Sequence, residues 1–181
     1  LSPALFSELN QIVTELSNQA DSMGCVILRG AGRCFSAGND LKAVRSAVKA
    51  KEKFFQAKTI DLIEKLPQPT IASVHGHCLT GALELALACD LMITSESANL
   101  ADTHGKWGMV PGWGMSVRLP KRVGLLKAKE MMFTGMSING LQAVEIGLSS
   151  QCVADDHLKV STLDLAESCL LYTSDAADDS L

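Results

Sequence analysis

A glutamate stands inside an apolar run that begins just after two glycines. Glu84 lies among leucines and alanines in the segment HGHCLTGALELALACDL, residues 75–91. A carboxylate in such surroundings is costly to ionise, so its side chain either faces outward or is held inside for chemistry. A buried carboxyl group can activate water or move a proton near neutral pH. Glu84 is therefore our first candidate for an acid–base residue.

Two glycine-containing segments indicate where a substrate oxygen could be held. The segment FSAGNDL (35–41) places Gly38 before Asn39, and CLTGALE (78–84) places Gly81 at the start of a predicted helix. Glycine permits tight turns and close approach of a ligand, and a helix N-terminus offers unpaired N–H groups. Two such groups aimed at one point form an oxyanion hole. Each segment alone is a weak signal, but the two in this order are specific.

Other catalytic motifs do not compete with this interpretation. The sequence contains no G-x-S-x-G, Walker A loop, H-E-x-x-H or G-x-G-x-x-G motif. His75 and His77 could begin a metal site, but no Asp, Glu or Cys stands at a spacing that would complete it. We therefore expect two loop histidines at the end of a strand, and no metal.

The hydrophobic pattern predicts an α/β domain that positions these segments. Short apolar runs predict strands at 25–29, 70–74, 91–95 and 151–154. Helical spacing predicts helices at 3–20, 81–89, 115–134 and 139–147, one or two helices within 42–66, and another from about 156. Glycine and proline indicate a loop over 104–114. Strands alternating with helices are typical of an α/β domain with parallel pairing.

Composition excludes several classes of partner. The chain has 181 residues with a net charge of −4 and 4% aromatic residues, so we expect neither nucleic acid nor an anionic membrane as a partner. Its six cysteines form no C-x-x-C pair, which favours reduced thiols. The sequence shows no secretion signal and no apolar run of 18 residues. We therefore expect a cytoplasmic protein.

The last residues differ from the rest of the chain. YTSDAADDSL is small, acidic and without periodicity, as appended non-native sequence would be. We expect a core over residues 1–170 and a disordered or loosely helical tail over 171–181.

Three spaced motifs resemble the crotonase, or enoyl-CoA hydratase/isomerase, superfamily. They are CFSAGNDL (34–41), QPTIASVHGHCLTGALELALACDL (68–91) and GMVPGWGMSVRLP (108–120), and the resemblance extends from about residue 1 to about residue 158. It implies a superhelix of repeated β-β-α units and an acyl-CoA substrate, with coenzyme A as part of the substrate and no other cofactor. It also implies a homotrimer or hexamer. Family members have strands before the first helix and helices after residue 158, so we expect a core that is incomplete at both ends.

The resemblance also assigns roles to individual residues. The backbone N–H groups of Asn39 and Gly81 would hold the thioester oxygen, and Glu84 would be catalytic. Contacts to coenzyme A and its acyl group would come from Gly81 and from the segment of Ala37, Gly38, Asn39, Asp40, Leu41 and Lys42.

The sequence departs from the family at one catalytic position. Two-glutamate hydratases have their second acid seven residues before the position of Pro111, where this chain has His104. Asp102 could orient that imidazole or only cap the loop. We expect hydration of a 2-enoyl-CoA with His104 as the second catalytic group. Decarboxylation of a malonyl-CoA analogue (methylmalonyl- or ethylmalonyl-CoA), enoyl-CoA isomerisation and acyl-CoA binding without catalysis are the alternatives.

Overall fold

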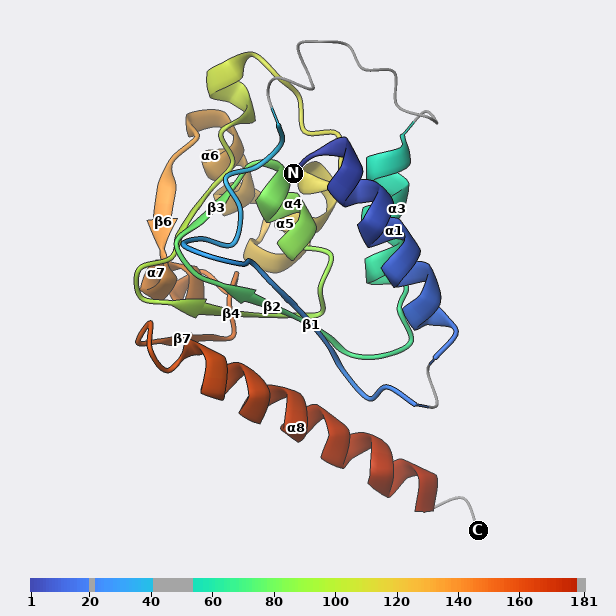
Figure 1. Ribbon diagram of the computed structural model, residues 1–181. Helices are drawn as coiled ribbons and strands as arrows, with labels where there is room; N and C mark the ends of the chain where they lie inside the picture. The colour runs from blue at the N-terminus through green and yellow to red at the C-terminus, as the bar shows by residue number, and fades with distance from the viewer. Residues whose placement is uncertain (20–21, 41–53, 179–181) are drawn as a thin grey trace.

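A parallel four-stranded sheet forms the centre of the protein. The computed structural model describes residues 1–19, 22–40 and 54–178. The strands lie in the order β1-β2-β4-β7, and every neighbouring pair is parallel (Figure 1). Their bounds are β1 (Val26–Arg29), β2 (Thr70–Val74), β4 (Leu91–Ser95) and β7 (Gln151–Val153). The predicted parallel α/β class is confirmed, and β2 and β4 have the predicted bounds.

Alternate residues of the central sheet face two different cores. In β2, Ala72 and Val74 belong to the main hydrophobic cluster, whereas Ile71 packs in a second cluster with Leu158, the first residue of helix α8 (Leu158–Asp178). Ser73 lies on the same face as Ile71 and shares a hydrogen bond with Thr162 of α8. Successive side chains of a strand point to opposite faces, so both faces of this sheet are covered.

A second sheet of three short strands was not predicted from the sequence. It consists of β3 (His77–Leu79), β5 (Asn99–Ala101) and β6 (Ser137–Asn139). β5 pairs parallel with β3 and antiparallel with β6. Three residues are too few to show an alternating pattern, so these segments look like loops in the sequence. The expectation that His77 lies in a loop is therefore wrong.

The second sheet also fixes the first glycine segment. The Ser36 N–H donates to the His77 carbonyl at 2.9 Å, and the Leu79 N–H donates to the Ser36 carbonyl at 3.2 Å. These two bonds hold residues 35–39 against β3, which leads directly into the second glycine segment. The two segments are thereby adjacent although about forty residues separate them in the chain.

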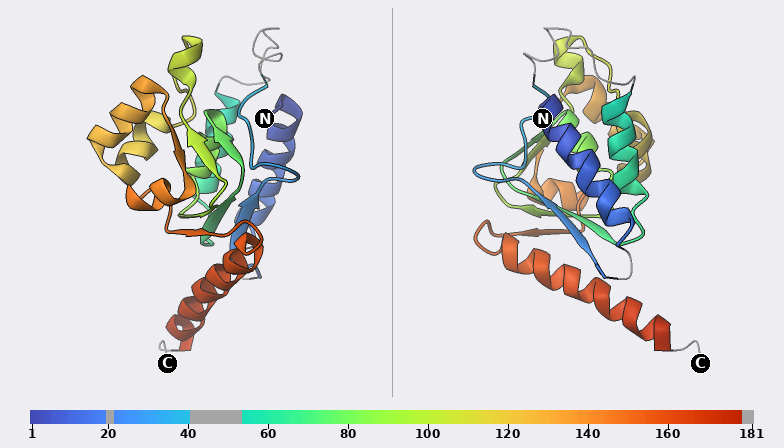
Figure 2. Two further views of the ribbon diagram at one scale, coloured as in Figure 1. Left: turned by 90° about the vertical axis from the view of Figure 1, so that its left-hand side faces the viewer. Right: turned by 45° about the vertical axis from the view of Figure 1, so that its right-hand side comes forward.

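Helices surround the two sheets, and several differ from their predicted bounds. They are α1 (Pro3–Ser17), α3 (Phe55–Glu64), α4 (Gly81–Ala86), the 3-10 helix η1 (His104–Trp107), α5 (Met115–Val123), α6 (Leu125–Thr134), α7 (Gly140–Glu145) and α8 (Leu158–Asp178). α1 and α3 pack side by side, and Figure 2 shows α1 and α7 on opposite sides of the strands.

Several helices near the second glycine segment and after it differ from the prediction. The helix predicted over 115–134 is two helices, because Gly124 adopts a φ of 79° between them. The helix predicted over 81–89 ends at Ala86, and the one predicted over 139–147 is α7. The predicted loop over 104–114 contains η1. Of the one or two helices expected within 42–66, α3 is one, and positions 42–53 lie outside the described residues.

The last helix leaves the body of the protein. The first half of α8 covers the central sheet, and the backbone stays helical through Asp178, beyond the boundary expected at residue 170. The left view of Figure 2 shows the end of α8 projecting away from the other elements.

All six cysteines are free thiols. Cys78 and Cys89 are buried, and burial raises the pKa of Cys89 to about 12. Within the described residues, no helix combines the length and the apolar character that crossing a membrane requires.

Candidate active site

A cavity of about 320 Å³ lies where the second sheet, the start of α4 and the loop after η1 meet. Its walls contain residues from both glycine segments and both candidate acid–base residues: Ala37, Asn39, Leu79, Thr80, Gly81, Glu84, Thr103, His104, Trp107, Met109, Val110, Gly112 and Trp113. Side chains from positions more than seventy residues apart therefore share one chamber.

Asn39 and Gly81, whose backbone N–H groups are the predicted donors, both line this cavity. Among the described residues, neither the Asn39 N–H nor the Gly81 N–H donates a hydrogen bond to another group. For Gly81 the reason is its place as the first residue of α4, where backbone N–H groups have no partner within the helix. Gly38 has a φ of 99°, and a Cβ there would lie 2.8 Å from the Leu79 carbonyl oxygen, so the close approach of the segments requires glycine.

Thr80 carries a backbone conformation that the sequence gave no reason to expect. Its φ of 58° and ψ of −114° are unusual for a residue with a side chain. Such a conformation costs about 1–3 kcal/mol and persists only where neighbouring contacts impose it. Here the Thr80 N–H donates to the Ala101 carbonyl at 2.8 Å, and its hydroxyl lies 2.7 Å from that of Thr103. This strained residue sets the direction in which α4 starts, directly before Gly81.

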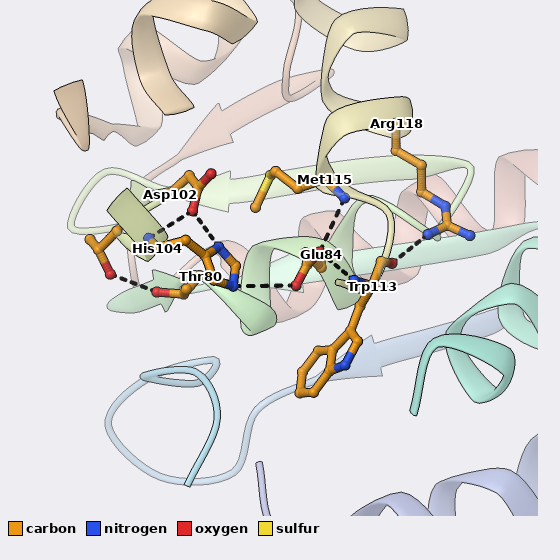
Figure 3. Close-up of polar contacts among 8 residues, drawn as sticks. Thr80, Glu84, Asp102, His104, Trp113, Met115 and Arg118 are labelled. Atoms are coloured by element: carbon orange, nitrogen blue, oxygen red, sulfur yellow. Dashed lines mark hydrogen bonds and ion pairs between the residues drawn. The ribbon is translucent and has the colours of Figure 1, made fainter. Parts of the chain in front are cut away.

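Glu84 is buried, and its two carboxylate oxygens have different environments (Figure 3). Oε1 accepts hydrogen bonds from the backbone N–H groups of Trp113 at 2.7 Å and Met115 at 3.1 Å. Oε2 lies 3.7 Å from Nε2 of His104. One oxygen is therefore fixed by the loop before α5, while the other faces the imidazole.

Burial is the largest influence on the Glu84 carboxyl group, and it raises the pKa. The N–H groups of Met115 and Trp113 and the imidazole of His104 act in the opposite direction, without cancelling the effect of burial. Glu84 thus combines 1% exposure with a proton affinity above that of an ordinary glutamate. This is a property expected of a general acid or base.

His104 lies between two carboxylates. Its Nδ1 is 2.6 Å from Oδ1 of Asp102, and its backbone N–H donates to the same oxygen at 3.1 Å. Its Nε2 is the atom that faces Glu84 (Figure 3). The His104 imidazole therefore contacts Glu84 through Nε2 and Asp102 through Nδ1 in the same structure.

Trp113 supports the site in ways that the sequence did not indicate. Its ring packs edge-on against Phe6 of α1, with centroids 4.9 Å apart and an interplanar angle of 69°. A Cβ on Gly81 would lie 2.5 Å from this ring, so the ring closes the space beside the start of α4. Arg118 donates to the Trp113 carbonyl at 2.8 Å and forms ion pairs with α3. The residues around Arg118 in the sequence give no sign of these contacts, because its ion-pair partners lie on another helix.

The structure brings only part of the expected coenzyme A segment to the cavity. Ala37 and Asn39 line it, whereas Gly38 and Asp40 do not, and the Asp40 N–H donates to the Leu1 carbonyl at 2.9 Å. Positions 41 and 42 of that segment lie outside the described residues. Among the described residues, no group of three or more His, Cys, Asp or Glu side chains is placed to hold a metal ion.

Comparison with known proteins identifies the family of the chain. A family profile described as enoyl-CoA hydratase/isomerase matches residues 1–178. The chain belongs to the enoyl-CoA hydratase/isomerase family. The resemblance of the three sequence motifs to this family is thereby confirmed.

Individual members of the enoyl-CoA hydratase/isomerase family are similar over most of the chain. A putative enoyl-CoA hydratase/isomerase of Bacillus subtilis, YngF, is 38% identical over 173 residues, which are 92% of this chain and 65% of the relative. A probable peroxisomal enoyl-CoA hydratase 1 of Arabidopsis thaliana is 31% identical over 170 residues, 94% of this chain and 64% of the relative. The chain therefore spans slightly less than two thirds of the length of these relatives.

A solved structure supports the same fold for this member of the family. The crystal structure of an enoyl-CoA hydratase from Bacillus anthracis matches with a TM-score of 0.85 and 38% identity, covering 93% of this chain and 67% of the other. The predicted crotonase-like fold is confirmed by this match.

Proposed function

We propose that this member of the enoyl-CoA hydratase/isomerase family adds water to a 2-enoyl-CoA. The observation that carries the proposal is the 3.7 Å approach of Glu84 Oε2 to His104 Nε2 in a cavity that Asn39 and Gly81 also line. Two acid–base groups and two backbone N–H donors around one chamber are the parts that such a reaction requires.

Each part has one step in the proposed reaction. The thioester carbonyl oxygen accepts hydrogen bonds from the N–H groups of Asn39 and Gly81, which stabilise the negative charge that develops on it. The Glu84 carboxylate removes a proton from water as the water oxygen bonds to C3 of the enoyl group. Glu84 passes that proton to Nε2 of the neutral His104 ring, and the imidazolium gives it to C2 of the enolate, which returns both side chains to their starting protonation states. The sum is addition of one water molecule across the double bond.

The surroundings of Glu84 suit it to the water-activating step. Its Oε1 is held by two backbone N–H groups, so the remaining oxygen keeps one orientation toward the chamber. Burial raises its pKa, which makes the carboxylate a stronger base than an exposed one. An imidazole can both accept and donate a proton, so His104 can fill the place that a second glutamate has in related hydratases.

The proposal extends to the substrate's carrier and to assembly. Coenzyme A would lie along residues 37–42 and be part of the substrate, with no other cofactor, and the protein would act in the cytoplasm as a homotrimer or hexamer. These statements rest on the family resemblance.

A panel of two reactions tests the proposal. Crotonyl-CoA hydration and methylmalonyl-CoA decarboxylation are followed in parallel for the wild-type chain, His104→Glu and His104→Ala. We expect hydration in the wild type, retained or increased hydration in His104→Glu, and at least a ~100-fold loss in His104→Ala, the lower end for acid–base catalysis.

Three other results would each favour one of the alternative functions. Wild-type decarboxylation that His104→Glu suppresses would favour the decarboxylase alternative, because a second anion repels the departing carboxylate. Conversion of a 3-enoyl-CoA without hydration would favour isomerisation. Binding of acyl-CoA with no turnover of any of these substrates would favour a binding protein.

A further inference from the structure

We infer that Asp102 is a positioning residue. It holds the hydrogen of the neutral His104 ring on Nδ1, so that Nε2 faces Glu84 with a free lone pair. The inference deepens the proposed function, since it concerns the same acid–base pair. Asp102 directly follows β5, is completely buried, and precedes His104 by two residues. The contacts of Asp102 with His104 indicate what this buried carboxylate does.

The contacts of Asp102 fix the tautomer of the neutral imidazole. Its Oδ1 lies 2.6 Å from Nδ1 of His104 and also accepts the His104 backbone N–H at 3.1 Å. An ionised carboxylate can only accept, so Nδ1 carries the hydrogen. Nε2 of the neutral ring is then unprotonated, and it is the atom 3.7 Å from Glu84 Oε2. A proton that Glu84 takes up can pass to Nε2, which leaves the carboxylate free again.

The second oxygen of Asp102 argues against a purely structural brace. Oδ2 is buried and has no hydrogen-bond partner among the described residues. Burying a negative charge with one oxygen unsatisfied is costly, and a loop brace would need only a neutral acceptor such as an amide or hydroxyl oxygen. A charged side chain is useful here because it stabilises the imidazolium that forms when Nε2 accepts a proton.

The surroundings of His104 leave this role to Asp102 alone. Glu84 on α4 and Asp102 are the charged groups that contact the ring in the described structure. On its other side a second hollow is lined mainly by apolar residues, among them Met132 and Phe133 of α6. No cation or further acid from α6 lines this hollow, so among the described residues Asp102 is the charged group that contacts Nδ1 and can hold the hydrogen on it.

Nitrogen-15 NMR of the histidine rings tests the inference without turnover. Spectra are recorded at a pH where the His104 ring is neutral, and its signals are assigned by their loss in His104→Gln. We expect protonated Nδ1 in the wild type and a shift of the proton toward Nε2 in Asp102→Ala. Asp102→Asn should keep the wild-type tautomer, because the amide oxygen can accept the same two hydrogens. Asp155→Asn, which alters an exposed carboxylate bonded to Ser97, is the matched control and should leave the His104 signals unchanged.

Two spectral outcomes overturn the inference. One is a wild-type ring with its proton on Nε2, and the other is a folded Asp102→Ala protein whose proton stays on Nδ1. If Asp102→Ala does not fold, the wild-type spectrum still decides. The wild-type chain could show the expected tautomer and yet fail to hydrate any enoyl-CoA. That result would contradict the proposed function but not this inference.

A kinetic comparison separates positioning from general support of the fold. Asp102→Ala should lower kcat for hydration at least ~100-fold, with KM changed by less than about twofold. The same substitution in a His104→Ala background should lower kcat by less than about twofold further, because Asp102 acts through the imidazole. Equal losses in the two backgrounds would show that Asp102 supports the site independently of His104.

Discussion

Replacing Glu84 by glutamine separates its charge from its shape. Glutamine keeps an oxygen at the Oε1 position, so the N–H groups of Trp113 and Met115, now at 2.7 and 3.1 Å, keep their acceptor. The atom beside His104 changes from a carboxylate oxygen into an amide NH₂ group, which can neither accept a proton nor activate water. We therefore expect Glu84→Gln to fold like the wild type and to lose activity.

The expected magnitudes follow from that difference. Loss of an acid–base group lowers kcat at least ~100-fold, which corresponds to about 2.7 kcal/mol in the activation free energy. The free energy of unfolding should change by less than about 1 kcal/mol near pH 4.5, because both hydrogen bonds to the side chain remain and a protonated glutamate is also neutral. Turnover is measured with the substrate that the wild-type chain converts, and stability by urea denaturation. The exposed Glu145→Gln is the control.

Two results would refute this reasoning. Wild-type turnover in Glu84→Gln would show that the chemistry takes place elsewhere. A loss of several kcal/mol in unfolding free energy would show that the buried carboxylate mainly supports the fold, since the activity loss would then follow from the damage to the structure.

Three further predictions concern stability. Burial raises the pKa of Glu84 above its ordinary 4.5. The contribution of the protonated side chain to the unfolding free energy is therefore complete below pH 4.5 and is lost as pH rises through the folded-state pKa. The unfolding free energy of Glu84→Gln minus that of the wild type should therefore grow from pH 4.5 toward neutrality in urea titrations. Gly81→Ala should cost about 1–3 kcal/mol in the same measurement because its Cβ would lie 2.5 Å from the Trp113 ring, whereas Gly112→Ala, with no neighbour within 4 Å, should be close to neutral. Phe6→Ala should cost about 3–5 kcal/mol and alter the tryptophan fluorescence, and unchanged values would show that this ring pair is not packed.

The sequence by itself determined the elements that have a clear local pattern. The apolar run of β2 follows Pro69 and that of β4 stands between Asp90 and Glu96, and the bounds of both strands were predicted without error. Ser2 followed by Pro3 and an apolar spacing of three and four residues predicted α1, which ends three residues before the predicted bound. The three spaced motifs also sufficed to identify the family. These features depend on residues within one segment, which is the range over which periodicity is informative.

Because sequence patterns are informative only within one segment, only some of the candidate site residues could be identified from the sequence. Glu84 stood out as an acid in an apolar run, Gly81 as a glycine at a helix start, and Asn39 and His104 through the family motifs. Nothing in the sequence could indicate the conformation of Thr80, because its unusual φ is imposed by contacts with β5 and with the following loop.

The tertiary structure alone decided how these residues meet. The strands β3, β5 and β6 are defined by pairing with one another rather than by any pattern of their own, and they hold Ser36 beside the start of α4. The partners of Glu84 come from positions 29 and 31 residues later in the chain. Its 3.7 Å distance from His104 depends on how α4 and η1 are placed by the two sheets. Such distances result from the packing of whole elements, and for that reason no local pattern of residues could have predicted them.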